Sequence, residues 1–147
     1  MYKLEHTGVP NVFLMNGYEC TVEDGESYIA YNAFIGLCDL TMLIGCCCDI
    51  DLTGAHIYDM RMHLNLNQTQ FGARLGYGKT FVSHWERNGK KCPVHAQQLI
   101  KLMVRASIEP KRHVSQCLRD LKVKTPERFE LTYKPEDNKW FWSNRPS

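Results

Sequence analysis

Polar side chains between residues 79 and 91 have the types and spacing of a surface that contacts an anion. At 3.6 residues per turn, a helix starting near Lys79 has one polar face, made of Lys79, Thr80, Ser83, His84 and Arg87. Val82 and Trp85 fall on the opposite side, where we expect them to be buried. Lys90 and Lys91 follow in the next loop. Ammonium and guanidinium groups placed this way suit contacts with the phosphates of a nucleic acid.

Two short helices and a tight turn are predicted to position these side chains. Asn67 is a good N-cap for a helix that carries Phe71 and Leu75. Gly76 is expected to end that helix and Gly78 to cap the next one, which runs to about Arg87. A short helix, a glycine turn and a second helix with a polar, basic outer face are what a DNA-reading helix-turn-helix needs.

The stretch from Leu66 to Pro93 also resembles a known family. It reads LNQTQFGARLG, then VSHWE and a basic loop that ends in proline. This combination resembles the Cro/phage-repressor (Xre-type) helix-turn-helix regulators and covers about residues 53–106. The resemblance implies a lambda-repressor-like helical domain that binds double-stranded operator DNA as a homodimer. For the whole chain we expect an α+β fold that is mainly α.

The resemblance implies base contacts for the outer face of the second helix, namely Lys79, Thr80, Ser83 and His84. Lys79 can bond guanine O6 and N7, and the Thr80 methyl can touch a thymine methyl. His84 can donate or accept according to its protonation state. Phe81 either contacts thymine methyls and sugar or packs on another subunit.

Phosphate contacts are expected from four residues. The family's glutamine, here Gln68 at the start of the first helix, binds a backbone phosphate and braces the second helix. Arg87, Lys90 and Lys91 flank the end of the second helix. The alternative is that these four are ordinary solvated polar residues.

Five residues have predicted structural roles. The resemblance implies a salt bridge between Arg61 and Glu86. Gly72 stands inside a helix, where glycine is unfavourable, so we expect a close helix crossing that admits only a very small side chain. Val82 and Trp85 are the predicted core contacts of the second helix.

Charge changes sign along the chain and indicates three segments. Residues 1–52 hold one basic and eight acidic residues, residues 53–108 eight basic and two acidic, and residues 109–147 nine basic and six acidic. We therefore predict an acidic N-terminal β/α region for dimerisation or partner binding, a DNA-binding domain, and a C-terminal helix with a β-hairpin. A sign change at the helix-turn-helix boundary favours a polyanion partner for residues 53–108.

Flanking helices of the DNA-binding segment are predicted at Thr53 to Leu64 and Val94 to Ser107. The second has an expected apolar stripe made of Ala96, Leu99, Ile100, Met103 and Ala106. Its outward residues are expected to be Gln97, Gln98, Lys101 and Arg105.

The N-terminal segment shows three short β-prone pieces: Val12 to Leu14, Tyr18 to Val22 and Ser27 to Tyr31. We expect them to form one small antiparallel sheet. Ala33 to Asp49 is apolar nearly all round, so it is either a core helix or a dimer interface.

After Pro110, a short helix with Val114, Cys117, Leu118 and Leu121 on one face is predicted. A β-hairpin of Arg128 to Tyr133 and Lys139 to Ser143 follows. Trp140 and Trp142 share one side of its second strand, where they either pack on the body, the favoured option, or anchor a partner.

No metal, cofactor or catalytic residue is predicted. The three consecutive cysteines Cys46, Cys47 and Cys48 diverge around a helix, and the chain has no Cys-x-x-Cys pair, so buried thiols are favoured over a metal site that would include His56. No catalytic signature motif is present. The sequence has neither a long apolar run nor a signal-peptide pattern. We expect a cytoplasmic, bacterial or phage-encoded protein.

The best interpretation is a dimeric, autoregulatory transcriptional repressor that reads an inverted repeat. The N-terminal N-G-Y, the apolar helix and the L-T-G entry also resemble the MqsA-like antitoxins, but the four zinc cysteines of that class are absent. One alternative is therefore an antitoxin that binds a toxin, or another protein partner, through its N-terminal region. Another is a protein-interaction adaptor that uses Trp140 and Trp142 and binds no DNA.

Overall fold

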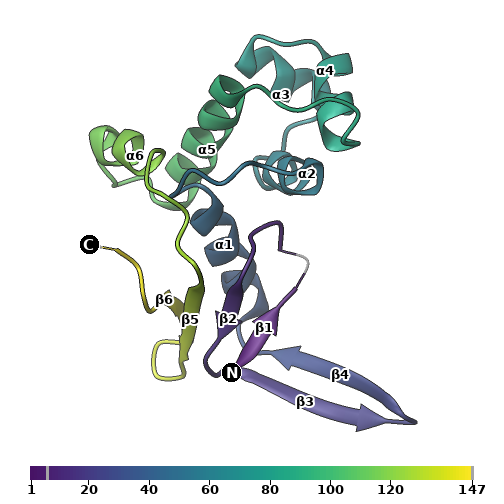
Figure 1. Ribbon diagram of the computed structural model, residues 1–147, viewed down its shortest axis with the longest axis vertical. Helices are drawn as coiled ribbons and strands as arrows, with labels where there is room; N and C mark the ends of the chain where they lie inside the picture. The colour runs from purple at the N-terminus through teal and green to yellow at the C-terminus, as the bar shows by residue number, and fades with distance from the viewer. Residues whose placement is uncertain (6, 147) are drawn as a thin grey trace. The chain divides into compact units, whose positions relative to one another are not determined.

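The computed structural model describes residues 1–5 and 7–146 and has an α+β architecture (Figure 1). It contains six helices and six strands in two small sheets within this part of the chain. Two compact units are formed, one by residues 1–41 with 126–147 and the other by residues 42–125. These units do not coincide with the three predicted segments, because the C-terminal hairpin joins N-terminal strands. No helix in the described ranges is long and apolar enough to cross a membrane.

The main sheet of the first unit joins the two ends of the chain. It contains β1 (Tyr2–Leu4), β2 (Val12–Leu14), β5 (Phe129–Lys134) and β6 (Lys139–Trp142), in the order β1-β2-β5-β6. β2 and β5 are parallel, and the other two pairs are antiparallel. Strands β2 and β5 alternate between buried and less buried residues, and their inward side chains form the sheet's core: Val12, Leu14, Phe129 and Leu131.

The predicted three-piece N-terminal sheet is wrong. Tyr18 to Val22 does not pair with Val12 to Leu14 but lies in β3 (Tyr18–Glu23), which forms a two-stranded sheet with β4 (Glu26–Tyr31) in the described part of the chain. The Asp24-Gly25 turn, with both residues at positive φ, connects these two strands directly. β2 instead finds its second neighbour in β5, which lies far away in the sequence.

Trp140 packs into the first unit, as the favoured option stated. Its ring contacts Tyr133 at a centroid distance of 5.5 Å, and its indole N–H donates to the Asn32 carbonyl at 2.7 Å. A Cβ placed on Gly17, which has a φ of +75°, would lie 2.7 Å from the Trp140 ring. Only glycine fits there. Trp142 is half-buried beside Phe129.

The second unit is helical. It contains α2 (Gly54–His63), α3 (Gln68–Leu75), α4 (Lys79–Glu86), α5 (Val94–Ile108) and α6 (Val114–Asp120). α1 (Phe34–Gly45) begins in the first unit, and its last residues, from Met42, belong to the second; it ends before the three cysteines, earlier than predicted. The core of the unit gathers buried apolar side chains from α2 to α5, among them Ile57, Phe71, Trp85 and Ile100. Cys117 on α6 and Leu121, which caps the helix, are buried, whereas Val114 and Leu118 are exposed, contrary to the predicted apolar face.

The expected orientation of α5 is right only in part, because Ala96 and Ile100 are buried as predicted but other residues are not placed as expected. Leu99 is exposed, and three residues expected in solvent are buried: Gln97, Lys101 and Arg105. Each has a polar partner that offsets its burial. Gln97 accepts a hydrogen bond from the Leu52 N–H at 2.9 Å, Lys101 donates to the carbonyls of Cys48 and Ile50, and Arg105 pairs with Asp120 at 2.8 Å. These residues hold the segment before α2, and α6, against α5.

Candidate nucleic-acid interface

α3 and α4 are joined by a tight turn that their own residues define. Asn67 and Gln70 form a reciprocal capping box at the start of α3. Gly76 ends α3 at a φ of +81°, and the Tyr77 N–H donates to the Gly72 carbonyl at 2.8 Å. A Cβ on Gly72 would lie 2.4 Å from the Tyr77 carbonyl oxygen and 3.2 Å from Val82. The close approach expected at Gly72 is therefore present, chiefly against the turn.

A buried ion pair links three helices. Arg61 on α2 donates to both carboxylate oxygens of Glu86 on α4, at 2.7 and 3.0 Å. The two side chains are only 10% and 7% exposed. Gln68, the first residue of α3, donates to the same carboxylate at 3.3 Å, and Arg61 also bonds the Leu66 carbonyl. The Glu86 hydrogen bond raises the pKa of Arg61 above its ordinary value. Because the pair is bidentate and shielded from water, it fixes the orientation of α4.

Four predicted base-contacting residues lie along the outer side of α4. Lys79 and Thr80 are exposed in its first turn, and Ser83 and His84 are half-buried in its second. Val82 and Trp85 are buried on the inner side, as expected. The cap residue Gly78 makes no side-chain hydrogen bond, so the first N–H groups of α4 remain available to an acceptor. A displayed polar face and a buried apolar face therefore occupy opposite sides of one short helix.

His84 is directed partly toward the loop after α4. Its Nδ1 would lie 3.1 Å from a Cβ at Gly89, and its carbonyl accepts from the Gly89 N–H at 2.8 Å. Its ring is therefore less displayed than Lys79 and Thr80. Asn88 and Gly89 end α4, as their sequence suggests, but the sequence did not reveal that the Asn88 side-chain oxygen accepts from the Gly54 N–H at 3.0 Å and ties this loop to α2. The Asn-Gly pair was the available signal for the helix end, because asparagine tolerates the positive φ of 58° found at Asn88.

Phe81 is half-exposed and stands beside Tyr77, with ring centroids 5.4 Å apart. The Tyr77 hydroxyl is hydrogen-bonded to His95 at the start of α5, at 2.8 Å. These rings extend the outer surface of α4 toward α5. The sequence did not reveal the Tyr77–His95 contact, because its partners lie on separate elements.

The predicted phosphate contacts have different surroundings. Lys90 and Lys91 are exposed in the loop after α4, and Lys91 forms a loose, solvated pair with Asp51 at 3.4 Å. Arg87 is exposed and folds back to donate to the Ser83 carbonyl at 3.3 Å. Gln68 is half-buried against Glu86. The structure thus supports a bracing role for Gln68 and leaves the lysines nearest to solvent.

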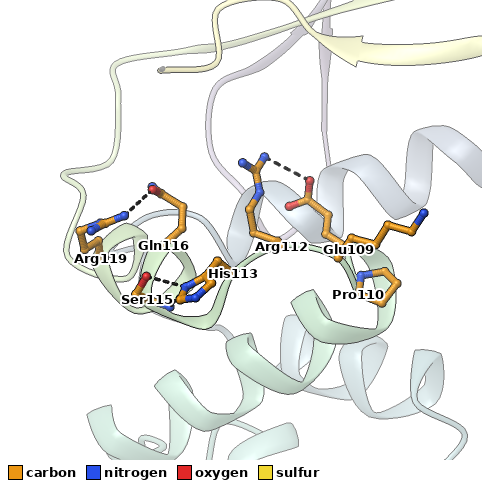
Figure 2. A pocket seen from close by; sticks show the side chains of 8 residues that line it. Glu109, Pro110, Arg112, His113, Ser115, Gln116 and Arg119 are labelled. Atoms are coloured by element: carbon orange, nitrogen blue, oxygen red, sulfur yellow. Dashed lines mark hydrogen bonds and ion pairs between the residues drawn. The ribbon is translucent and has the colours of Figure 1, made fainter.

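A basic groove is lined by the loop that follows α5 and by residues of α6 (Figure 2). Its volume is about 1000 Å³, and its cationic lining residues are Lys111, Arg112 and Arg119. Arg112 faces Glu109 at 3.6 Å, and Arg119 donates to Gln116 at 2.8 Å. The groove is shallow and solvated, and it adds positive surface to the helical unit.

The cysteines after α1 are buried. Burial raises the pKa of the Cys46 thiol, and it raises that of Cys92 to about 12, so both are thiols at neutral pH. Cys46 and Cys48 donate weakly to carbonyls one turn earlier. The described part of the chain contains no group of three or more side chains arranged to hold a metal ion.

Charge separates between the two compact units. The helical unit holds thirteen basic and six acidic residues, and the other unit five basic and ten acidic ones. The outer side of α4 therefore belongs to the positive part of the chain. No protein-family model, curated protein or solved structure that we compared with the chain matches it.

Proposed function

We propose that the chain is a sequence-specific DNA-binding repressor in which α3, the turn and α4 form a helix-turn-helix. In this proposal α4 enters the major groove, and α3 lies across the backbone. The observation that carries it is the combination in α4 of a buried anchor, Glu86 with Arg61, and an exposed polar first turn, Lys79 and Thr80. A helix held this rigidly while it displays donors at its free end suits direct reading of bases.

Roles follow from exposure. Lys79 and Thr80 read base edges, with guanine and thymine as their chemically matched targets. Ser83 and His84, one turn further along α4, supply secondary contacts. Lys90, Lys91 and Arg87 bind phosphates and set the register on the duplex. Gln68 holds α4 through Glu86 and presents the start of α3 to the backbone.

Charge supports the same proposal. A unit with thirteen basic and six acidic residues is attracted to a polyanion, whereas the unit with five basic and ten acidic residues is repelled. Affinity should therefore fall steeply as salt rises. Because one recognition helix reads only a few base pairs, two copies on an inverted repeat are needed for useful specificity.

The test begins with selection of duplexes from a random pool by the full-length protein, followed by titration of the selected site. We expect Lys79→Ala and Thr80→Ala each to weaken binding by about 10-fold or more and to relax one base position. Lys90→Ala should weaken all sequences equally and reduce the salt slope by about 1. Lys122→Ala, an exposed lysine beyond α6, is the matched control and should change little.

Two outcomes would overturn the proposal. One is that the pool yields no preferred sequence. The other is that a preferred site binds the Lys79→Ala and Thr80→Ala proteins as tightly as the unaltered protein. Either result would remove α4 as the reading element.

A further inference from the structure

The hairpin formed by β3 and β4 is exposed on both faces. Ten consecutive residues, 19–28, are exposed, and Figure 1 shows the two strands as a ribbon extending away from the main sheet of the same unit. A lone two-stranded hairpin is marginally stable in water. Glu23 also lies directly across from Glu26, a like-charged pair that weakens it further. A surface that covers this hairpin would therefore stabilise it.

Its register separates apolar and acidic residues onto opposite faces. Cross-strand partners share a face and successive residues alternate. The apolar face therefore contains Tyr18, Cys20, Val22, Ser27, Ile29 and Tyr31. The acidic face contains Glu19, Thr21, Glu23, Glu26, Tyr28 and Ala30. No charged residue lies on the apolar face.

Among the residues that the structure describes, the apolar face is covered at its base and exposed further out. Tyr2 of β1 contacts Tyr18 and Tyr31 there, at centroid distances of 5.3 and 6.4 Å. Further out, Cys20 is exposed and Val22 is 71% exposed. The face continues onto α1, because Phe34 stacks on Tyr31 at 5.8 Å and is itself 56% exposed. An apolar strip thus runs from Val22 to Phe34.

We propose that this apolar face binds the same face of a second copy of the chain. Two uncharged apolar faces can meet without burying a charge, because the carboxylates of each hairpin point to the outside. DNA is repelled by four carboxylates, and a basic protein would be drawn to the acidic face and would leave the apolar one open. The two-fold pairing is isologous, so one patch serves both copies.

This contact deepens the proposed function, since a second copy supplies the second recognition helix. The strip is formed by far fewer residues than the roughly 20–30 per partner of a standard interface, so its self-association is weak and reversible in the absence of DNA. On an inverted repeat, the two copies are held close together, and a weak contact then yields cooperative binding.

Sedimentation equilibrium of the full chain without DNA, over a concentration series, tests the contact. We expect a monomer–dimer equilibrium that strengthens with salt, because salt screens the four carboxylates on each hairpin. This trend is opposite to that of DNA binding. Val22→Asp should weaken dimerisation about 10-fold or more, about 1.4 kcal/mol. Thr21→Asp is the matched control, with the same charge added to the adjacent residue on the acidic face, and should leave the dimer within about 2-fold.

Crosslinking gives a second measurement. Cys20 is the exposed cysteine on the apolar face, and packed sheets lie about 10 Å apart, so a bismaleimide with a flexible spacer should join the Cys20 thiols of two copies across the proposed contact. Cys20→Ser should abolish the covalent dimer, and Cys38→Ser, which alters the other exposed cysteine, should retain it. Thermal unfolding of Val22→Asp and Thr21→Asp verifies that both remain folded.

The proposal is overturned if the wild-type chain stays monomeric, if Val22→Asp leaves the dimer intact, if Thr21→Asp disrupts it equally, or if crosslinking ignores Cys20. Self-association is measured without DNA, so its failure leaves the DNA-binding proposal standing. A duplex pool that yields no site would remove the proposed function but not the dimer.

Discussion

The two compact units differ in the side chains that they bury. The helical unit buries the charged side chains of Arg61, Lys101 and Arg105, and each of these three has a polar partner. Among the described residues of the other unit, no charged side chain is buried, and its β3–β4 hairpin is exposed over residues 19–28, which include Val22. The contrast extends to net charge, which is positive in the helical unit and negative in the other.

This difference in burial suggests different properties for the two units: a fixed arrangement of helices in one, and association with another surface in the other. Buried charged groups with specific partners hold helices in one arrangement, because any other arrangement would leave a buried charge without a partner. Exposed apolar groups define no internal arrangement, but they gain free energy when another surface covers them. In our proposals, the helical unit therefore presents fixed residues to DNA, and the hairpin of the other unit binds a second copy of the chain.

The largest expected effect comes from Arg105→Ala. The Arg105 side chain is 1% exposed and pairs with Glu109 at 3.3 Å and Asp120 at 2.8 Å. Its removal leaves the partly buried carboxylate of Asp120 without its cation and leaves Glu109 with the more exposed Arg112. We expect a loss of about 5 kcal/mol in the free energy of unfolding, measured by urea denaturation.

Arg112→Ala is the control for that loss. Arg112 pairs with the same Glu109 at 3.6 Å but is 40% exposed, and solvent screens the pair. Its loss should cost less than about 1 kcal/mol. Equal effects of the two substitutions would show that burial of polar groups does not hold α5 and α6 together.

Glu86→Ala should have the next largest effect. It leaves Arg61 buried without its carboxylate and releases Gln68, at a cost of about 4 kcal/mol. Glu86→Gln retains an acceptor for Arg61 and should lose less. Urea denaturation of both proteins checks this order. Unchanged stability in Glu86→Ala would mean that the pair does not fix α4, and it would weaken the basis for the proposed DNA contacts.

The sequence predicted local features of the helical unit well. Asn67, Gly76 and the bounds of α3 and α4 follow from cap and turn chemistry within a few residues. The orientation of α5 could not be predicted this way, because Gln97, Lys101 and Arg105 are buried only through partners elsewhere in the chain. A polar residue on a helix normally indicates solvent, and the partners that reverse this rule leave no periodic signal.

The first unit shows the same limit. The two hairpins, at Asp24-Gly25 and before Lys139, could be predicted from their turn-forming residues. The parallel pairing of β2 with β5 could not be predicted, because nothing in the sequence near Val12 indicates a neighbouring strand at Phe129. For the candidate interface, spacing placed Val82 and Trp85 inside and Lys79 and Thr80 outside. The half-buried position of His84 depends on the loop at Gly89.

His56 should make the helical unit sensitive to acid. Its ring is 2% exposed, and neither ring nitrogen has a hydrogen-bond partner in the described structure. Burial, reinforced by the charge of Lys101, lowers its pKa from 6.5 to about 4. Between these values the unfolded chain binds a proton that the folded chain does not. The His56 proton therefore does not lower the free energy of unfolding above about pH 6.5, but it lowers it by about 3 kcal/mol as the pH drops to 4.

Urea denaturation across this range, compared with His56→Leu, isolates the effect. The substituted protein should lose the part of the slope that belongs to this proton, while the carboxylates contribute to both proteins alike. If the free energy of unfolding depends on pH equally in both proteins, the His56 ring is hydrated in solution and its pKa is not lowered by burial.

Two helical glycines give the smallest effects and the sharpest contrast, because alanine should shift stability in opposite directions. In α3, a Cβ at Gly72 would lie 2.4 Å from the Tyr77 carbonyl, and backbone must move to admit it. In α1, a Cβ at Gly36 meets nothing within 4 Å. We expect Gly72→Ala to lose about 1–3 kcal/mol through overpacking. Gly36→Ala should gain about 0.5–1 kcal/mol, because alanine loses less backbone entropy in a helix. Thermal and urea unfolding measure both changes in stability. If Gly72→Ala raises the free energy of unfolding, the turn before α4 can move to admit a methyl group, and α4 is not held rigidly.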